Sequence, residues 1–372
     1  MDSSGGVILH VREANIWGSP ERLVLGQIRF LEGYSCIPVT YRRRGVSNAF
    51  ADGLRREGVG CVELAEFGPG DWRTIYRLAR TIREQGAGLV VTHDFKSNFY
   101  GYLASKMTGC PHIVHFHGVT AEGVRVRFYN AIDRAVMRRC RAIITVAEQT
   151  RQRLVSMGVD GDKIEVVINA VPPEAFEKVT YRSLSPESGR KLIIAAGRLS
   201  HEKGMDILVK AARILKDRGL QFDIRIYGDG PERTELDALI SRLDVGDCVT
   251  LAGFMGDLRP VYAQSEFLVI PSRSEAFPLV LLEAWAQGAP VVATPVGRLP
   301  ELIEHEVDGL LAPGVVPDSL AEAMGDALKR PGFRDRCGGS GRDKVRDRFS
   351  FPVQVAALKN IYGRHMKAGQ RS

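Results

Sequence analysis

The chain has 372 residues, of which 44% are hydrophobic and 26% are charged; because this length exceeds the size at which single hydrophobic cores usually stop growing, we expect two folded domains and no extended disordered tract. Its formal net charge of +7 suits an anionic small ligand, a nucleic acid or an acidic membrane surface. No stretch approaches the roughly 20 apolar residues that span a bilayer, and the amino terminus lacks the features of a signal peptide, so neither membrane spanning nor export is expected.

The first half of the chain alternates short apolar runs with longer segments of helical periodicity. This alternation predicts a parallel sheet with crossover helices. The predicted strands lie at residues 7–11, 36–40, 60–64, 89–92, 113–116, 142–146 and 164–168. After them, Val171-Pro172-Pro173 and the polar stretch 181–191 have the composition of a linker.

A second series of the same kind follows, with predicted strands at residues 192–196, 222–227, 249–251, 267–270, 290–294 and 309–312. A last amphipathic segment, residues 352–366, is expected to return to the first domain. We therefore predict an α/β fold of two Rossmann-like doubly wound domains facing across a cleft. The first comprises residues 1–178 completed by the helix 352–372, and the second residues 186–350.

The segment Gly197–Gly204 follows a predicted strand and precedes an amphipathic helix. Within it, Arg198 offers a planar fork of donors and Lys203 a compact charge, and the following helix adds the positive end of its dipole. This combination suits a diphosphate. Two ordinary charges on a solvated loop are the alternative.

A second strand end is followed by Ser274-Glu275-Ala276-Phe277-Pro278-Leu279, and Glu283 comes later. Pro278 suits the first turn of a helix, which would put Glu275 on the loop and Glu283 within the helix. The backbone N–H groups of Ala276, Phe277 and Leu279 would then form an anion-binding nest. Spacing alone is equally consistent with a buried apolar helix face on which Glu283 is merely solvated.

These residues resemble the retaining GT-B glycosyltransferases, the group 1 enzymes similar to glycosyltransferase family 4. The signature of that family pairs an arginine-lysine clamp with two glutamates eight positions apart. The resemblance covers nearly the whole chain and includes the segments 17–22, 117–118, 228–231, 299–301 and 308–311. It implies an enzyme that uses a nucleotide sugar as co-substrate, without a metal or another cofactor.

The resemblance also implies roles for individual residues. Arg198 and Lys203 match the positions that bind the donor diphosphate, and Glu283 matches the glutamate that holds the nucleotide ribose. Glu275 matches the glutamate beside the transferred sugar, where it orients or stabilises the sugar and is not assigned as a nucleophile.

Further donor contacts are implied for the backbone at 276, 277 and 279. Gly18 matches a glycine that lets the backbone approach a phosphate or acceptor closely, and His117 matches a histidine near the reacting sugar. The family commonly has glycine where this chain has Ala276 and Arg298, which leaves the donor sugar open.

Two other signals point elsewhere. Asp160-Gly161-Asp162 spells a metal-binding D-x-D, but it falls where a turn between a helix and a strand is expected, so no metal is predicted. The basic helix at 125–141 could rest on anionic lipid and bring a lipid-linked acceptor near, or it could be a solvated face. Nucleic-acid binding is not expected because no recognition module is present.

The six cysteines are scattered without disulfide-like or zinc-like spacing, so we expect reduced thiols and a cytoplasmic chain, with possible peripheral contact at the inner membrane face. The predicted function is sugar transfer to a hydroxyl acceptor in glycan, exopolysaccharide or glycolipid synthesis. The alternatives are a nucleotide-sugar epimerase, a phosphorylase, or a catalytically silent subunit that binds nucleotide sugar. A dinucleotide-dependent oxidoreductase is disfavoured because no G-x-G-x-x-G follows the first strand.

Overall fold

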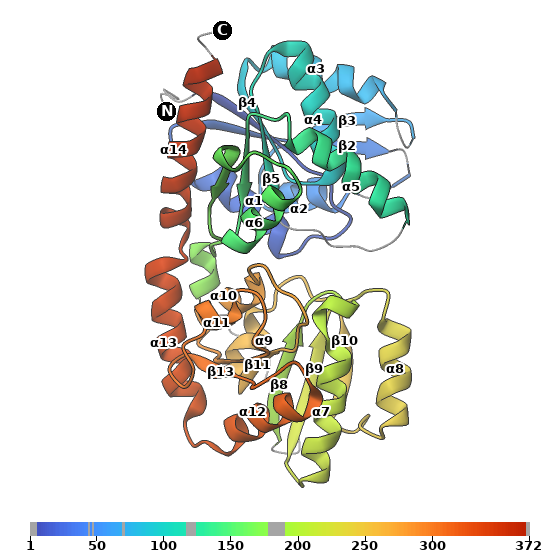
Figure 1. The fold of residues 1–372 in the computed structure, drawn as a ribbon, viewed down its shortest axis with the longest axis vertical. Helices are drawn as coiled ribbons and strands as arrows, with labels where there is room; N and C mark the ends of the chain where they lie inside the picture. Colours follow the sequence, from blue (N-terminus) through green and yellow to red (C-terminus); the bar gives the residue numbers. More distant parts are fainter. Residues whose placement is uncertain are drawn as a thin grey trace. The chain divides into compact units, whose positions relative to one another are not determined.

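A computed structural model describes residues 6–43, 45–46, 48–68, 71–116, 124–177 and 190–369, with the backbone alone at 124–130 and 367–369. The chain divides into two compact units. Unit 1 comprises Met1–Asn169 and Phe351–Ser372, and unit 2 comprises Ala170–Ser350. Each unit is a parallel sheet covered by helices (Figure 1).

The sheet of unit 1 has seven parallel strands in the order β3-β2-β1-β4-β5-β6-β7. They are β1 (Val7–Val11), β2 (Ser35–Arg43), β3 (Val62–Glu66), β4 (Ala87–Thr92), β5 (His112–Phe116), β6 (Ala142–Thr145) and β7 (Ile164–Val166). The helices are α1 (Ser19–Phe30), α2 (Ala49–Arg56), α3 (Arg73–Glu84), α4 (Phe95–Thr108), α5 (Val124–Met137), α6 (Glu148–Ser156), the 3-10 turn η1 (Gly161–Lys163) and α14 (Phe351–Gly369).

Two apolar layers stabilise unit 1, one on each face of its sheet. Successive residues of a strand point to opposite faces, so Ile8 packs in the cluster of α1 and α14, and Leu9 packs in the cluster of α3 and α4. Helix α14 lies close against α1, because a methyl group built at Gly26 would stand 2.1 Å from the ring of Phe351. The end of the chain therefore completes the core of the first unit.

The sheet of unit 2 has six parallel strands in the order β10-β9-β8-β11-β12-β13. They are β8 (Lys191–Ala196), β9 (Phe222–Tyr227), β10 (Val249–Gly253), β11 (Phe267–Ile270), β12 (Val291–Ala293) and β13 (Gly309–Leu311). The helical elements are η2 (Pro173–Phe176), η3 (His201–Lys203), α7 (Met205–Asp217), α8 (Arg233–Arg242), α9 (Arg259–Gln264), α10 (Leu279–Ala286), α11 (Leu299–Leu302), α12 (Pro317–Lys329) and α13 (Phe333–Arg348).

Every strand predicted from the sequence overlaps a strand of the structure, and the predicted class of two doubly wound parallel sheets is confirmed. One local prediction is wrong: Pro278 is not in the first turn of a helix but is the residue that caps it, in an extended conformation, and α10 begins at Leu279. Within the described ranges, no helix has the length and apolarity needed to cross a bilayer. All six cysteines are free.

Candidate functional site at the switch point of unit 2

The strand order of unit 2 reverses between β8 and β11, which are hydrogen-bonded neighbours. Ligands of open parallel sheets bind outside the carboxyl ends of the strands at such a switch point. Two loops leave the sheet there: Gly197–Gly204 after β8, named here the clamp loop, and Pro271–Pro278 after β11, named the glutamate loop. The predicted donor residues of unit 2 lie on these loops and on α10.

The two loops are joined by an ion pair between Lys203 and Glu275, whose Nζ and Oε1 atoms lie 2.7 Å apart. The Ser272 hydroxyl donates to the same carboxylate oxygen at 2.7 Å. Only 6% of the Glu275 side chain is exposed, against 27% for Lys203. Arg198, by contrast, is exposed. The structure thus brings together Lys203 and Glu275, which are far apart in the sequence. It leaves Arg198, on the same loop as Lys203, open to solvent.

Backbone packing sets the distance between these loops. Gly204 has φ +64°, and a methyl group there would stand 2.1 Å from the carbonyl oxygen of Pro271. The amide of Arg273 donates to the carbonyl of Glu202 at 2.8 Å. Only glycine allows this approach, because another residue would bring both a clash and a strained backbone.

A bidentate ion pair reinforces the contact. The guanidinium of Arg273 donates to both carboxylate oxygens of Asp206, at 2.7 and 2.8 Å. Burial by itself raises the pKa of Asp206, but hydrogen bonds from Arg273 and Lys210 outweigh it and lower that pKa to about 2. The charge of Asp206 is therefore stable at any physiological pH, and the glutamate loop stays tied to the start of α7.

Helix α10 starts directly after the glutamate loop. Leu279, Val280 and Glu283 are its half-buried positions, whereas Leu281, Leu282 and Ala284 are buried. Residues three and four apart share a helix face, so Glu283 lies one turn along the same accessible face as the first helical residues. The Tyr262 hydroxyl is 3.5 Å from Glu283 Oε2, a long contact. Glu283 is neither a core residue nor fully solvated.

Between the two glutamates, Phe277 also has a packing role. The Phe277 side chain is 5% exposed and packs edge-on against Phe349, with ring centroids 5.7 Å apart. The Arg298 guanidinium lies over the Phe277 ring at 5.3 Å and pairs with Glu301 at 2.9 Å. Arg298 is thus held by stacking and an ion pair. Only the backbone of Phe277 is a candidate for ligand contact, and Ala276 is half-buried beside it.

Gly297, on the loop after β12, brings a third strand end to the site. It has φ +55°, and a methyl group there would stand 1.7 Å from the carbonyl oxygen of Glu275. The loop after β12 therefore presses directly on the backbone of the glutamate. Because any side chain would displace that backbone, this glycine fixes where the Glu275 carboxylate points.

Two predicted residues belong to the first unit. Gly18 caps the amino terminus of α1, and its amide donates to Glu21 Oε2 at 2.9 Å. Its φ of −131° suits any residue, and a methyl group there would meet only ordinary contacts. Nothing within the described chain requires glycine here. His117 lies outside the described residues.

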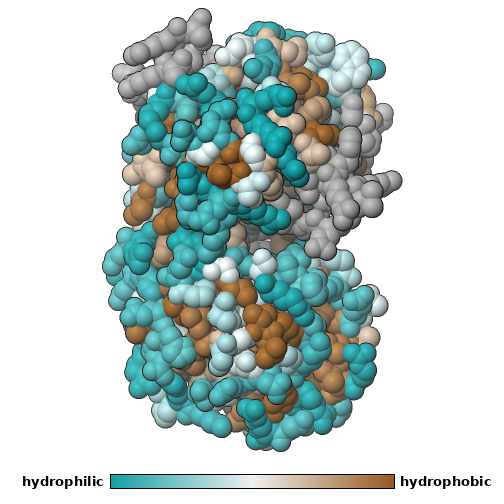
Figure 2. All heavy atoms as spheres, viewed as in Figure 1, coloured by the Kyte–Doolittle hydropathy of each residue, from teal (hydrophilic) through white to brown (hydrophobic). Residues whose placement is uncertain are grey.

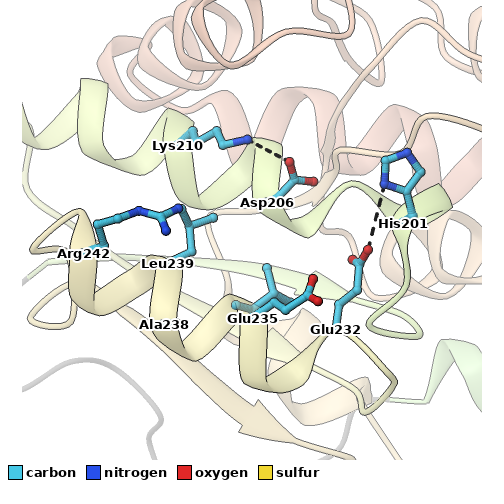
Figure 3. A pocket seen from close by; sticks show the side chains of 9 residues that line it. His201, Asp206, Lys210, Glu232, Glu235, Ala238, Leu239 and Arg242 are labelled. Atoms are coloured by element: carbon cyan, nitrogen blue, oxygen red, sulfur yellow. Dashed lines mark hydrogen bonds and ion pairs between the residues drawn. The ribbon is translucent and has the colours of Figure 1, made fainter.

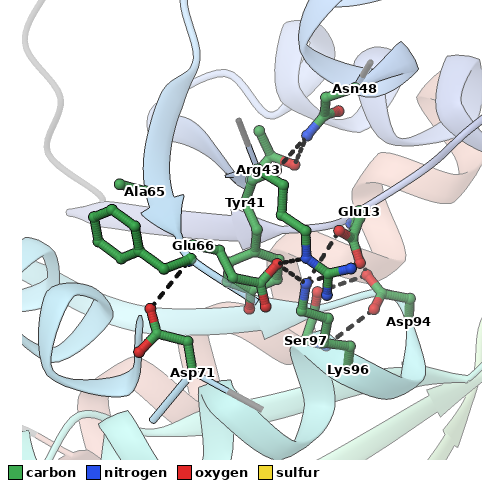
Figure 4. A network of polar contacts seen from close by, with 12 residues as sticks. Glu13, Tyr41, Arg43, Asn48, Ala65, Glu66, Asp71, Asp94, Lys96 and Ser97 are labelled. Carbon is green, nitrogen blue, oxygen red and sulfur yellow. Dashed lines mark hydrogen bonds and ion pairs between the residues drawn. The ribbon is translucent and has the colours of Figure 1, made fainter. Parts of the chain in front are cut away.

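A polar network that was not predicted from the sequence lies at the carboxyl ends of β1 to β4 and is drawn in Figure 4. Lys96 Nζ lies 3.1 Å from both carboxylate oxygens of Glu13 and 2.7 Å from Glu66 Oε2. Arg43 donates to the same oxygen of Glu66 at 2.8 Å, and the Lys96 charge sits 4.5 Å from the centre of the Tyr41 ring.

This network straddles the switch point of unit 1, because Glu13 follows β1 and Lys96 follows β4. The Glu66 side chain is fully buried, and among the described residues its Oε1 atom has no hydrogen-bond partner. The rule that ligands bind beyond strand ends at a switch point would have identified Glu13 and Lys96 from the sequence. Their approach across the sheet could not be read from spacing.

Buried histidines lie beneath the same edge. His10 stacks on His93 with ring centroids 5.3 Å apart, and His115 lies 5.2 Å from His93. Burial lowers the pKa of His10 to about 3, and that of His112, whose Nε2 atom contacts the Thr92 hydroxyl at 2.9 Å, also to about 3. These two rings are neutral at physiological pH.

A separate hollow of about 430 Å³ lies between α7 and α8 (Figure 3). Charged side chains dominate its walls, including the pairs Lys210 with Asp206 at 3.0 Å and His201 with Glu232 at 3.9 Å. None of the predicted donor residues lines it. It is therefore distinct from the switch-point site.

The D-x-D segment has a structural role. Asp160 caps the turn η1, and its carboxylate accepts from the amide of Asp162 at 3.1 Å. Among the described residues, no group of three or more potential metal ligands lies together.

Comparisons with known proteins agree with this geometry. The family model described as "Glycosyl transferases group 1" matches residues 179–344, and that described as "Glycosyl transferase 4-like domain" matches residues 36–170. The chain is 30% identical over 289 residues to an uncharacterized glycosyltransferase of Methanocaldococcus jannaschii, covering 73% of each chain. It is 32% identical over 190 residues to the amylovoran biosynthesis glycosyltransferase AmsK of Erwinia amylovora, covering 49% of this chain and 46% of AmsK.

Among solved structures, HepE of Anabaena, in complex with UDP and glucose, superimposes with a TM-score of 0.82 at 19% identity. The superposition covers 95% of this chain and 98% of HepE. At this identity the likeness concerns the GT-B fold.

Proposed function

Since the chain belongs to the group 1 glycosyl transferases, which are retaining enzymes that depend on a nucleotide sugar, we propose that its donor is a UDP-sugar. The acceptor that we propose is a hydroxyl group of a growing glycan or glycolipid. The observation that carries the donor assignment is the Lys203–Glu275 pair at the β8/β11 switch point. UDP is proposed because HepE, which has the same fold, was solved with UDP and glucose.

The proposed donor site works mainly by electrostatics. When the bond to the sugar breaks, negative charge develops on the leaving diphosphate. Arg198 is exposed, and Lys203 can donate to a phosphate while it keeps one hydrogen bond to Glu275 because an ammonium has three donors. The first amides of α10 and the positive end of its dipole add to this field.

The two glutamates take different parts in the proposal. Glu275 is anchored by Lys203 and Ser272 and braced by Gly297, which suits a group that orients the transferred sugar. Glu283 lies on the accessible face of α10, half-buried, and suits the ribose diol. Because these cations and amides already stabilise the leaving group, the proposal needs no metal.

On the acceptor side we propose the unit 1 network. Its carboxylates and ammonium are able to hydrogen-bond sugar hydroxyls, and Glu13 and Lys96 keep 31% and 19% of their side chains exposed. The name of AmsK, a polysaccharide biosynthesis enzyme, supports a glycan acceptor. Replacing Glu13 by glutamine should then raise KM for the acceptor more than KM for the donor.

The decisive experiment is donor binding and turnover by the purified protein. UDP-glucose, UDP-galactose, UDP-N-acetylglucosamine and GDP-mannose are each tested for thermal stabilisation, since a bound ligand stabilises the folded state. Glu283→Gln should weaken UDP-sugar binding by about tenfold or more, as expected for a lost hydrogen bond to a charged group. Glu275→Gln should lower kcat with little change in Kd.

Glu235→Gln, on the surface of α8, is the matched control and should change neither quantity. Absence of stabilisation by every UDP-sugar would overturn the donor assignment. Inverted anomeric configuration of the product, measured by NMR, would contradict the retaining reaction.

A further inference from the structure

Three aromatic side chains stand out of unit 1 between the end of β3 and the first turn of α3. Phe67 is 76% exposed, Trp72 61% and Tyr76 54%. Large aromatic residues are rarely this accessible, and together they contribute several hundred Å² of surface that favours a partly apolar environment. The other strongly exposed aromatic side chain among the described residues, Phe254, belongs to unit 2.

The three side chains are held by the fold. Trp72 and Tyr76 make an edge-to-face contact with ring centroids 5.4 Å apart. The Arg77 guanidinium lies over the Phe67 ring at 5.1 Å and donates to the carbonyl of Ala65 at 2.7 Å. Asp71 accepts from the amide of Phe67 at 3.2 Å. Phe67 is therefore tied through Arg77 to α3, the helix that Trp72 caps and on which Tyr76 lies.

Helix α3 adds a row of arginines next to them. Its buried positions include Ile75, Leu78 and Ile82, which leaves Arg73 and Arg80, 64% and 77% exposed, on the outward side. The helix also carries Arg77 and Arg83, and its one acidic residue is Glu84. At 1.5 Å per residue, the row from Arg73 to Arg83 extends about 15 Å along the axis.

We propose that this aromatic and basic face, formed by Phe67, Trp72, Tyr76, Arg73 and Arg80, docks on the surface of a bilayer that contains anionic lipids. The aromatic rings would enter the headgroup region, where Trp and Tyr are favoured because one end of each is apolar and the other polar. The arginines would lie at the level of the lipid phosphates, whose negative surface potential attracts basic side chains.

Charge distribution favours a lipid surface over a protein partner. The positive charges are spread along one helix face, which an extended anionic sheet can complement at every position at once. On the face of unit 2 drawn in Figure 2, hydrophobic patches are interrupted by hydrophilic residues, and no comparable aromatic trio occurs in the described part of unit 2.

The helix suggested by sequence, residues 125–141, is a weaker candidate. Arg138 uses its guanidinium to hold the carbonyls of Met157 and Gly158, at 2.6 and 3.1 Å. Arg138 is thus engaged with the backbone, whereas Arg73 and Arg80 stay largely exposed although they pair with Asp71 at 3.9 Å and Glu84 at 2.6 Å. The docking face on α3 does not depend on the identity of the donor or acceptor.

Vesicle binding tests the proposal directly. The full chain is sedimented with phosphatidylcholine vesicles and with vesicles containing 30 mol% phosphatidylglycerol. We expect binding to the anionic vesicles only, weakened by added salt. Phe67→Ser/Trp72→Ser and Arg73→Glu/Arg80→Glu should each reduce binding at least tenfold. Val155→Ser and Arg346→Glu, exposed residues of α6 and α13, are the matched controls.

Tryptophan fluorescence gives an independent readout. Of the three tryptophans, Trp285 is fully buried and Trp17 packs against Gly53, so a blue shift on adding vesicles reports Trp72. Trp72→Phe should still bind but lose the shift. Wild-type binding by the Phe67→Ser/Trp72→Ser variant would overturn the proposal. Failure of the wild type to bind anionic vesicles would also overturn it. If sedimentation velocity instead showed a wild-type dimer that Phe67→Ser/Trp72→Ser abolishes, the face would be a contact between copies of the chain, and the proposal would be wrong.

Discussion

Among the described residues, replacing Lys203 by methionine would leave the Glu275 carboxylate, 6% exposed, with the Ser272 hydroxyl as its one side-chain partner. Losing one member of a buried pair costs about 3–5 kcal/mol, and of an exposed pair about 0–1. Because Lys203 is 27% exposed, we expect Lys203→Met to destabilise unit 2 by about 2 kcal/mol, or roughly 30-fold in its unfolding equilibrium.

Replacing the other member of the pair, in Glu275→Gln, should destabilise unit 2 less. In Glu275→Gln the Lys203 ammonium can turn toward water, whereas the buried carboxylate of the Lys203→Met variant cannot. The double variant Lys203→Met/Glu275→Gln should therefore recover most of the lost stability, because it removes the uncompensated charge. Its glycosyl transfer should stay at least a hundredfold below wild type if both groups act on the donor. The double variant would thus be nearly as stable as the wild type while remaining almost inactive.

Hydrogen exchange followed by mass spectrometry is the suitable assay, because the two units need not unfold together. Peptides from β8 and β11 report the site, and peptides from β1 and β4 of unit 1 serve as the internal reference. Wild-type exchange of Lys203→Met in β8 and β11 would refute a stabilising Lys203–Glu275 pair, as would a double variant no more stable than Lys203→Met.

Three further outcomes are expected. Gly204→Ala should lower the melting temperature of unit 2 far more than Gly219→Ala: both have positive φ, but only at Gly204 does the new methyl meet a backbone oxygen, at 2.1 Å; equal effects would contradict this. Because burial lowers the pKa of His10 and His112 to about 3, below the ordinary 6.5, the unfolded chain binds more protons between these values. The contribution of these histidines to the free energy of unfolding is therefore full above about pH 6.5 and decreases below it, by up to about 1.4 kcal/mol per pH unit for each histidine. Urea unfolding from pH 7 to 4 should show this slope, which His112→Gln should reduce. Sugar transfer should be unchanged by EDTA, and activity that is lost and then restored by a divalent cation would overturn the metal-free proposal.

Local sequence signals were sufficient for the fold class. The apolar run 267–270 coincides with β11 because a fully buried parallel strand is apolar along its whole length. The run 222–227 coincides with β9, in which Asp223 and Arg225 alternate with buried apolar residues. Turn chemistry was less decisive: Pro278 fits both the cap and the first turn of a helix, and only the packing of the glutamate loop selects the cap. The binding and catalytic roles stay predictions for every site residue, for Arg198, Lys203 and Glu275 as for Gly18, His117 and Glu283.

The sequence by itself determined which residues follow the strands, and hence that Arg198, Lys203 and Glu275 stand on loops at strand ends, with Glu283 on the helix that comes next. Only the tertiary structure decided that Lys203 pairs with Glu275 across 72 residues, because this requires β8 and β11 to be neighbours in the sheet. The same holds for Lys96 and Glu66 in unit 1. Spacing along a chain specifies neighbours within one helix or strand, whereas the order of strands in a sheet decides which loops meet.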